Sequence, residues 1–342
     1  VTGVQTCALP ISLLARGQRL ADLQQHGIVL HDVQTDEWTT DRVALTGQLA
    51  PDDPYDLALV IMRKNHALQF LPTLAANRCI PNVLFLMNNA AGPEALAEAL
   101  GRERVLIGFP SSAGYRDGHV MHVLTGRPGD ERDVPIGEID GRETDRIRQV
   151  AAALASMPGF EVDVRPDMDA WLKYHVALLM PSLAAALYGC GTDMIRLAGT
   201  RDALVLALRA VREGFQVLQA LGYPITPEEM SFFAWAPEPL LIAIFQRRLR
   251  HPLVEVALAR HAAAARDEVQ HLADEFLELG RLTTVPTPVI DRLYAYFDPA
   301  APLIPADSAE IPLDWRAVRV GLAVAGAVAG VAVGGWLIRR RQ

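Results

Sequence analysis

The chain has 342 residues, of which 51% are hydrophobic, which is enough to form two domains that each bury a core. Its formal net charge of −8 argues against a nucleic-acid partner, which would require a basic surface. The three cysteines, which have no CxxC spacing, argue against a disulfide framework and fit a reducing compartment such as the cytoplasm.

The first residues of the chain, VTGVQTCALPI, resemble a translated sequencing adaptor. We therefore expect residues 1–11 to be foreign to the fold, with a natural N-terminal extension as the alternative. The pattern that predicts structure begins at Ser12.

Residues 12–166 alternate between short apolar runs and amphipathic stretches, which is typical of a doubly wound α/β domain. The predicted strands are Ser12–Ala15, Ile28–His31, Leu57–Met62, Asn82–Met87, Arg104–Gly108, His119–Leu124, Val134–Ile139 and Phe160–Val164. The predicted helices are Ala67–Ala76, Pro93–Leu100 and Glu143–Ser156.

Helical periodicity dominates from Asp167 onward and predicts an all-α second domain over residues 167–298. Its helices are expected at Met168–Leu187, Arg201–Leu221, Pro237–His251, Leu253–Leu279 and Thr287–Tyr296. A Pro- and Ala-rich linker is expected at 299–317, and a hydrophobic tail helix with a basic end at 318–342.

The tail contains an uncharged stretch, Val320–Ile338, that is long enough to cross a bilayer core of about 30 Å. Tryptophans lie near its ends, arginines flank it, and glycines recur every fourth residue, as in membrane helices that approach one another closely. We expect it to anchor cytoplasmic domains to a membrane. A buried soluble helix is the alternative.

Two motifs in the first domain carry basic residues directly after predicted strands. SLLARG places Arg16 after the first of these strands, and LALVIMRKN places Arg63 and Lys64 after a later one. The carboxyl ends of parallel strands line the ligand crevice of doubly wound sheets, and an arginine presents a bidentate fork to phosphate. An ordinary surface arginine is the alternative for Arg16.

Three further motifs carry polar residues in apolar surroundings. LFLMNNAAGPEAL places Asn88 between a strand and a helix, where an asparagine can also simply form a turn. MDAWLKYHVALLMP places Lys173 on a largely apolar helix, although most helical lysines are exposed. RDEVQHLADEF contains Glu268; a solvated helix carboxylate is its alternative, and that description suits Asp267, Asp274 and Glu275 well.

In this order, these stretches resemble the ketopantoate reductase family over roughly Ser12–Phe297. The resemblance implies a Rossmann-like NADP-binding domain, an all-α substrate domain and NADPH-dependent reduction of a 2-keto acid. It assigns Lys173 as the proton donor, with the option of pairing with Glu268, and it assigns Glu268 and Asn88 to substrate binding. It assigns Arg16, Arg63, Lys64 and Asn88 to the cofactor NADP(H). A homodimer remains open.

Three departures from the family pattern bear on this assignment. The first strand and the GxGxxG loop are absent from residues 12–342, so we expect the chain as written to be truncated and inactive. Ala177 and Pro181 stand where the family often has asparagines. The family's serine-containing stretch before Glu268 has no counterpart. The last two put ketopantoate itself in question as the substrate.

Other classes of function are also open. A non-catalytic NADP-binding or redox-sensing module is one alternative, and a related hydroxyacid or opine dehydrogenase is another. No metal site is expected, because His119 and His122 are three residues apart on a predicted strand and so lie on opposite faces.

Overall fold

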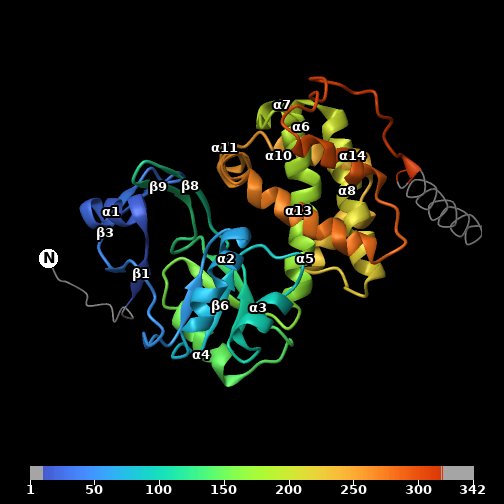
Figure 1. Ribbon diagram of the computed structural model, residues 1–342. Coiled ribbons are helices and arrows are strands. Elements are labelled where there is room, and N and C mark those ends of the chain that lie inside the picture. Colours follow the sequence, from blue (N-terminus) through green and yellow to red (C-terminus); the bar gives the residue numbers. More distant parts are fainter. Residues whose placement is uncertain (1–10, 317, 319–342) are drawn as a thin grey trace, which may run out of the picture.

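The computed structural model describes residues 11–316 and 318, which form an α/β domain followed by a helical domain (Figure 1). The predicted two-domain plan is confirmed. Three sequence predictions concern parts of the chain outside the described residues: the foreign segment (apart from Ile11), the missing first strand with its loop, and the membrane helix over 320–338. They stay predictions.

A five-stranded sheet in the order β11-β10-β7-β6-β5 forms the centre of the α/β domain. Its strands are β5 (Ala58–Val60), β6 (Val83–Leu86), β7 (Val105–Gly108), β10 (Arg132–Glu138) and β11 (Phe160–Val164). The first three run parallel, and β10 is antiparallel to β7 and parallel to β11. All five were predicted from apolar runs, and every residue of β6 and β7 is buried.

Helices cover both faces of this sheet. Helices α2 (Lys64–Ala76) and α3 (Glu94–Leu100) pack on one face with Val83 and Phe85. Helix α4 (Asp145–Leu154) packs on the other face with Leu84 and Leu86. Successive side chains of a strand point to opposite faces, so β6 contributes to both cores.

The strands predicted for this doubly wound domain do not all lie in one sheet. Strand β1 (Ser12–Leu14), which leads into α1 (Gly17–His26), pairs with β4 (Ala44–Thr46) instead. A four-stranded sheet contains β3 (Trp38–Asp41), β2 (Ile28–Asp32), β9 (Val120–Leu124) and β8 (Ala113–Asp117) in that order. An apolar run indicates a strand, but tertiary contacts choose its partner. The sequence also missed β3, because all its residues are exposed and it has no apolar pattern.

The helical domain begins with one long helix made of α5 (Met168–Leu178), a π-helical turn (Leu179–Ala184) and α6 (Ala185–Gly189). Pro181 explains the π turn, because proline has no N–H and its ring would clash with the carbonyl four residues earlier. The Ser182 hydroxyl donates to that carbonyl, of Ala177, at 3.0 Å. Within the described residues this is the one helix long and apolar enough to span a membrane, with a mean hydropathy of 1.2, but 78% of its apolar window is buried, as in a core helix.

Helix α8 (Arg201–Ala220) contacts α7 (Met194–Gly199), α9 (Ser231–Trp235), α10 (Glu238–Arg248), α13 (Arg266–Arg281) and α14 (Pro288–Tyr294), as Figure 1 shows. A π-helical turn at Glu255–Arg260 joins α11 (Pro252–Val254) to α12 (His261–Ala264), and this segment lies beside β8 of the α/β domain. The 3-10 turns are at Glu228–Met230 and Ala295–Phe297. The single helix predicted over Leu253–Leu279 is interrupted at Ala265, where φ is −125° and ψ is 35°. This break sets the direction of α13.

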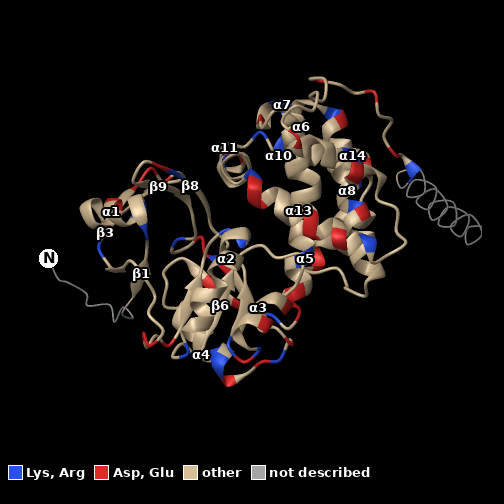
Figure 2. Ribbon diagram, in the orientation of Figure 1, with Lys and Arg blue, Asp and Glu red and all other residues tan. Residues whose placement is uncertain are grey.

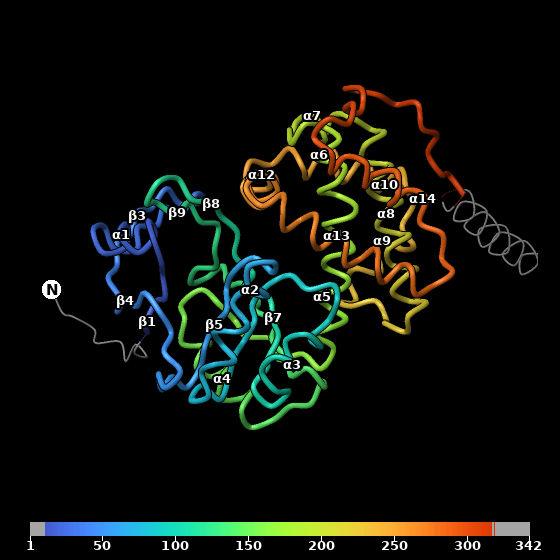
Figure 3. Tube along the Cα trace, viewed as in Figure 1, coloured from blue at the N-terminus to red at the C-terminus, as the bar shows by residue number. Residues whose placement is uncertain are grey.

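Residues 298–316, here called the C-terminal strap, lie along the outside of the helical domain (Figure 3). Ile304 is 5% exposed, and its N–H donates to Gly189 O at 2.8 Å. The Asp202 carboxylate accepts the N–H groups of Glu310 and Ile311, both at 2.9 Å. The segment expected to be a linker is therefore held against the domain along its length.

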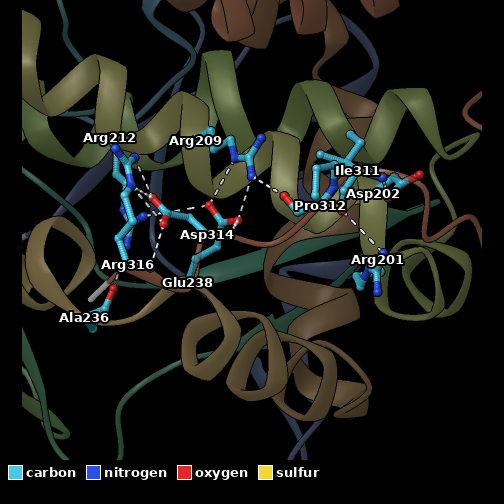
Figure 4. A network of polar contacts seen from close by, with 10 residues as sticks. All are labelled: Arg201, Asp202, Arg209, Arg212, Ala236, Glu238, Ile311, Pro312, Asp314 and Arg316. Atoms are coloured by element: carbon cyan, nitrogen blue, oxygen red, sulfur yellow. Dashed lines mark hydrogen bonds and ion pairs between the residues drawn. The ribbon is translucent and has the colours of Figure 1, made fainter. Parts of the chain in front are cut away.

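Glu238 holds the end of the strap (Figure 4). Its side chain is 1% exposed, and it accepts two hydrogen bonds from Arg209, at 2.8 and 3.0 Å. It also accepts the N–H of Asp314 at 2.9 Å, and Arg209 donates to Pro312 O at 2.8 Å. One buried carboxylate thus connects α8, α10 and the strap.

Candidate active site

The candidate site lies where α2, the loop after β6, α5 and α13 meet, and Figure 2 shows charged residues of both signs in this region. Only two of the 32 Lys and Arg residues of the chain are lysines, and they are Lys64 and Lys173. They are 3% and 2% exposed. Lysines are almost never fully buried unless they are paired, so two buried lysines at one junction of the two domains need a specific reason.

Lys64 is the first residue of α2, and it contacts the helical domain through its side chain and its backbone. Its ammonium lies 2.5 Å from Glu275 Oε1 and donates to Glu275 Oε2 at 2.7 Å. It also donates to Asn89 Oδ1 at 2.6 Å. Its backbone N–H donates to Glu268 Oε1 at 3.2 Å, so a carboxylate from α13 caps the start of α2.

Burial lowers the pKa of Lys64, because removing an ammonium from water disfavours its charged form. The Glu275 carboxylate opposes this effect on the pKa, and the nearby charge of Lys173 adds to it. The carboxylates of Glu275 on α13 and Asp169 on α5 therefore favour the charged form of Lys64, whereas its burial disfavours it.

Glu268 and Glu275 lie seven residues apart on α13, which places both on one helix face. Their side chains are 4% and 12% exposed. His261 Nε2 lies 3.6 Å from Glu268 Oε2, and His271 Nε2 lies 3.3 Å from Glu275 Oε1. Each carboxylate of this face therefore has a histidine beside it, which is His261 of α12 for Glu268 and His271 of α13 for Glu275.

The loop after β6 is shaped by Asn89, which is 1% exposed. Asn89 Oδ1 accepts the N–H of Gly92 at 3.0 Å, and Asn89 Nδ2 donates to Gly92 O at 2.9 Å. The backbone of Gly92 has a φ of +97°, a conformation that side-chain-bearing residues rarely adopt. The neighbouring Asn88 has a buried Oδ1 with no hydrogen-bond partner among the described residues.

Lys173 lies on α5 beside this loop. Its ammonium forms a short ion pair with Asp169, one turn earlier on the same helix, and lies 5.0 Å from the ring centroid of Tyr223. A Cβ added at Gly92 would lie 3.2 Å from Lys173 Nζ, so the loop and the ammonium are in near contact. The expected option of a Lys173–Glu268 pair is wrong. The Lys173 ammonium pairs with Asp169 on α5, and Glu268 accepts the backbone N–H of Lys64.

The residues predicted for the site are thus only partly brought together. Lys64, Lys173 and Glu268 lie at the junction of the domains. Arg63 lies at its edge, where it donates to Asp267 Oδ1 at 3.0 Å. Arg16 is exposed at the start of α1, with its guanidinium 5.6 Å from the centroid of the Phe70 ring.

Sequence reasoning missed Glu275, Asn89 and Asp169. The description of Glu275 as a solvated carboxylate is wrong, because it is paired with a buried lysine. Its seven-residue spacing from Glu268 was a signal that could have found it. Asn89 is adjacent to Asn88, and only the tertiary structure shows which of the two side chains contacts Lys64.

Comparisons with known proteins agree with this two-domain arrangement. The family model for ketopantoate reductase PanE/ApbA matches residues 5–139, and the model for the C-terminal domain of the same family matches residues 167–300. Among curated protein sequences no relative matches the chain.

Solved structures share the fold at low identity. D-mandelate dehydrogenase, solved with NADH and anilino(oxo)acetate, has a TM-score of 0.67 and 12% identity, covering 84% of this chain and 89% of that one. A PanE/ApbA family ketopantoate reductase from Ralstonia eutropha has a TM-score of 0.65 and 18% identity over 84% and 89% of the two chains. The 2-dehydropantoate 2-reductase of Geobacter metallireducens has a TM-score of 0.63 and 17% identity over 86% and 100%.

An α/β domain joined to a helical domain is the two-domain plan of the reductases whose structures this chain resembles. The two family models together span both domains, and the chain belongs to the ketopantoate reductase family. The described residues contain no group of three or more His, Cys, Asp or Glu side chains that could hold a metal ion.

Proposed function

We propose that the protein reduces the keto group of a 2-keto acid to a hydroxyl group, with NADPH as the hydride donor and Lys173 as the proton donor. The observation that carries this proposal is the position of Lys173, which is 2% exposed and lies against the loop after β6. An ammonium held in a water-poor site can donate a proton to the developing alkoxide, or stabilise its charge.

The surrounding residues have supporting roles. Asp169 holds the Lys173 ammonium in one position through the ion pair on α5. Glu268, at the start of α13, is proposed to accept a hydrogen bond from a donor on the substrate. Ala177 is fully buried, with its Cβ near Gly214, so it lines the core and takes no part in recognising the substrate.

The residues present fit a nicotinamide cofactor at two points. The buried and unpaired Asn88 Oδ1, at the carboxyl end of β6, fits the carboxamide N–H of a nicotinamide, because a buried acceptor without a partner is costly. The exposed Arg16 guanidinium fits the additional phosphate of NADPH. When bound, the cofactor supplies the hydride, and the residues above position the substrate and provide the proton.

The test is a screen of 2-keto acids, ketopantoate and aryl 2-keto acids included, on a full-length version of the protein, and it follows NADPH and NADH absorbance. We expect Lys173→Ala to lower turnover by roughly 10²- to 10⁴-fold, the range for lost general acid catalysis. Lys173→Arg retains the positive charge but does not give up a proton readily. Low turnover in this variant would indicate that Lys173 donates a proton, and retained turnover would indicate that it stabilises charge.

A Lys173→Ala variant that keeps its melting temperature and near-normal turnover would remove Lys173 from the mechanism. Binding of NADPH without reduction of any 2-keto acid would favour a non-catalytic NADP-binding module.

A further inference from the structure

Three hydrogen-bond donors of the α/β domain converge on one carboxylate from the helical domain. Lys64 Nζ donates to Glu275 Oε2 at 2.7 Å, and the backbone N–H groups of Ala90 and Ala91 donate to the same oxygen at 3.3 and 3.2 Å. An ammonium and two adjacent backbone amides aimed at one oxygen form an anion-binding cradle. Glu275 is the anion that occupies it in this structure.

The donors of this cradle also make contacts that do not involve Glu275. The loop that carries the two amides is closed by the paired hydrogen bonds between Asn89 and Gly92, and Asn89 Oδ1 also accepts from Lys64. All of these contacts lie within the α/β domain. Glu275, by contrast, reaches the cradle from α13, so a small movement of one side chain would vacate it.

The cradle lies beside the proposed proton donor. Gly92 follows Ala91 directly, and a Cβ added at Gly92 would lie 3.2 Å from Lys173 Nζ. In a 2-keto acid the carboxylate and the keto group are on adjacent carbons. A carboxylate held by the cradle therefore brings the keto oxygen toward Lys173.

A second partner for Glu275 lies next to the cradle. His271 Nε2 is 3.3 Å from Glu275 Oε1, but this buried nitrogen makes no hydrogen bond among the described residues. A short rotation of the Glu275 side chain toward His271 would pair this nitrogen and free the two amides. The displaced carboxylate is thus not left without a partner.

We propose that Lys64 and the Ala90 and Ala91 amides form the carboxylate subsite of the substrate, and that Glu275 occupies this subsite until the substrate displaces it. The inference rests on the proposed function, and it explains how this chain binds a carboxylate without the family's serine-containing stretch. It gives Glu275 the role of an internal competitor, which weakens the binding of small carboxylates until they displace it.

The experiment measures the binding of oxamate, a non-reducible analogue of a 2-keto acid, by calorimetry on the full chain. If the cradle is free for about 1–10% of the time in the parent, Glu275→Gln should tighten oxamate binding by about tenfold to a hundredfold. The matched control is Glu278→Gln on the same helix, whose carboxylate is 68% exposed, and it should bind oxamate like the parent. Glu275→Ala is the second variant, since it vacates the cradle completely.

The double variant Lys64→Gln with Glu275→Gln should lose the gain, because it removes the cation of the cradle without leaving an unpaired buried charge. Isotopic labelling of lysine provides a second readout by NMR, because the chain contains only two lysines and their signals are therefore easily assigned. Oxamate should shift the Lys64 signal in Glu275→Gln at concentrations that leave the parent unchanged.

Oxamate binding that is unchanged or weaker in both folded Glu275 variants would overturn the proposal. Inorganic phosphate is the comparison probe: an equal gain for phosphate would assign the cradle to a phosphate of the cofactor and also overturn it. Tighter oxamate binding without reduction of any keto acid would refute the proposed function but retain the subsite. Reduction of a keto acid with no effect of the Glu275 variants on oxamate binding would refute the subsite but retain the proposed function.

Discussion

Gly92 offers a sharp test of the site geometry, because the chain contains a matched control for it. Gly92 and Gly222 have φ values of +97° and +87°. A Cβ at Gly222 would meet nothing within 4 Å, whereas one at Gly92 would overlap Glu94 Oε2 and lie 3.2 Å from Lys173 Nζ. The two alanine variants therefore share the backbone strain and differ in what the new methyl group touches.

The backbone strain sets the effect on stability. A residue with a side chain at such a positive φ costs about 1–3 kcal/mol, so both variants should lose a similar free energy of unfolding. The Glu94 side chain can rotate away from the new methyl group. Lys173 is held by Asp169 and by burial, so its ammonium has to shift by a few tenths of an ångström.

We expect Gly92→Ala to lower kcat with the best 2-keto acid by about tenfold, on a scale where a 1 Å misplacement costs about 10²-fold. Gly222→Ala should keep the parent's kcat. Urea unfolding measures the stability of each variant, and NADPH absorbance measures turnover. If Gly92→Ala is destabilised like Gly222→Ala but turns over at the same rate, the loop does not position Lys173 and the site geometry is wrong.

Three further predictions follow from single groups. Burial lowers the pKa of His175 to about 4, so the unfolded chain binds this proton more tightly than the folded chain does. Lowering the pH from 7 to 5 should therefore reduce the free energy of unfolding of the parent by about 2 kcal/mol more than that of His175→Gln, as measured by urea unfolding at both pH values. An equal loss in the variant would exclude His175 as the cause. Glu238→Gln should lower the free energy of unfolding by about 2–3 kcal/mol, because Arg209 and the strap lose a buried partner. The control Glu255→Gln disrupts an exposed pair and should cost at most about 0.5 kcal/mol. Similar losses in both variants would contradict the role of Glu238. Arg16→Ala should weaken a preference for NADPH over NADH measured as the ratio of kcat/KM, and a parent that uses both equally would refute the assignment of Arg16.

The sequence alone determined the elements whose pattern is local. Buried strands such as β6 and β7 consist of apolar residues throughout, and the helices of the second domain show their period directly. Lys173 could be singled out for the same reason, because a lysine on an apolar helix contradicts its surroundings. These features depend on residues that are neighbours in the chain, so local physical chemistry identifies them.

Only the tertiary structure decided the contacts between distant segments. Strand β1 has the composition of a core strand, yet it pairs with β4 because strand pairing depends on which segments meet in space. Arg63 and Lys64 are adjacent and both basic, but the direction in which α2 begins buries the lysine and leaves the arginine at the edge. The sequence around Glu275 predicts a surface residue of α13, but the structure places it against the loop after β6, where it contacts Ala90, 185 residues away in the sequence. Its buried ion pair with Lys64 forms only when the fold removes both side chains from water, so no local pattern could predict it.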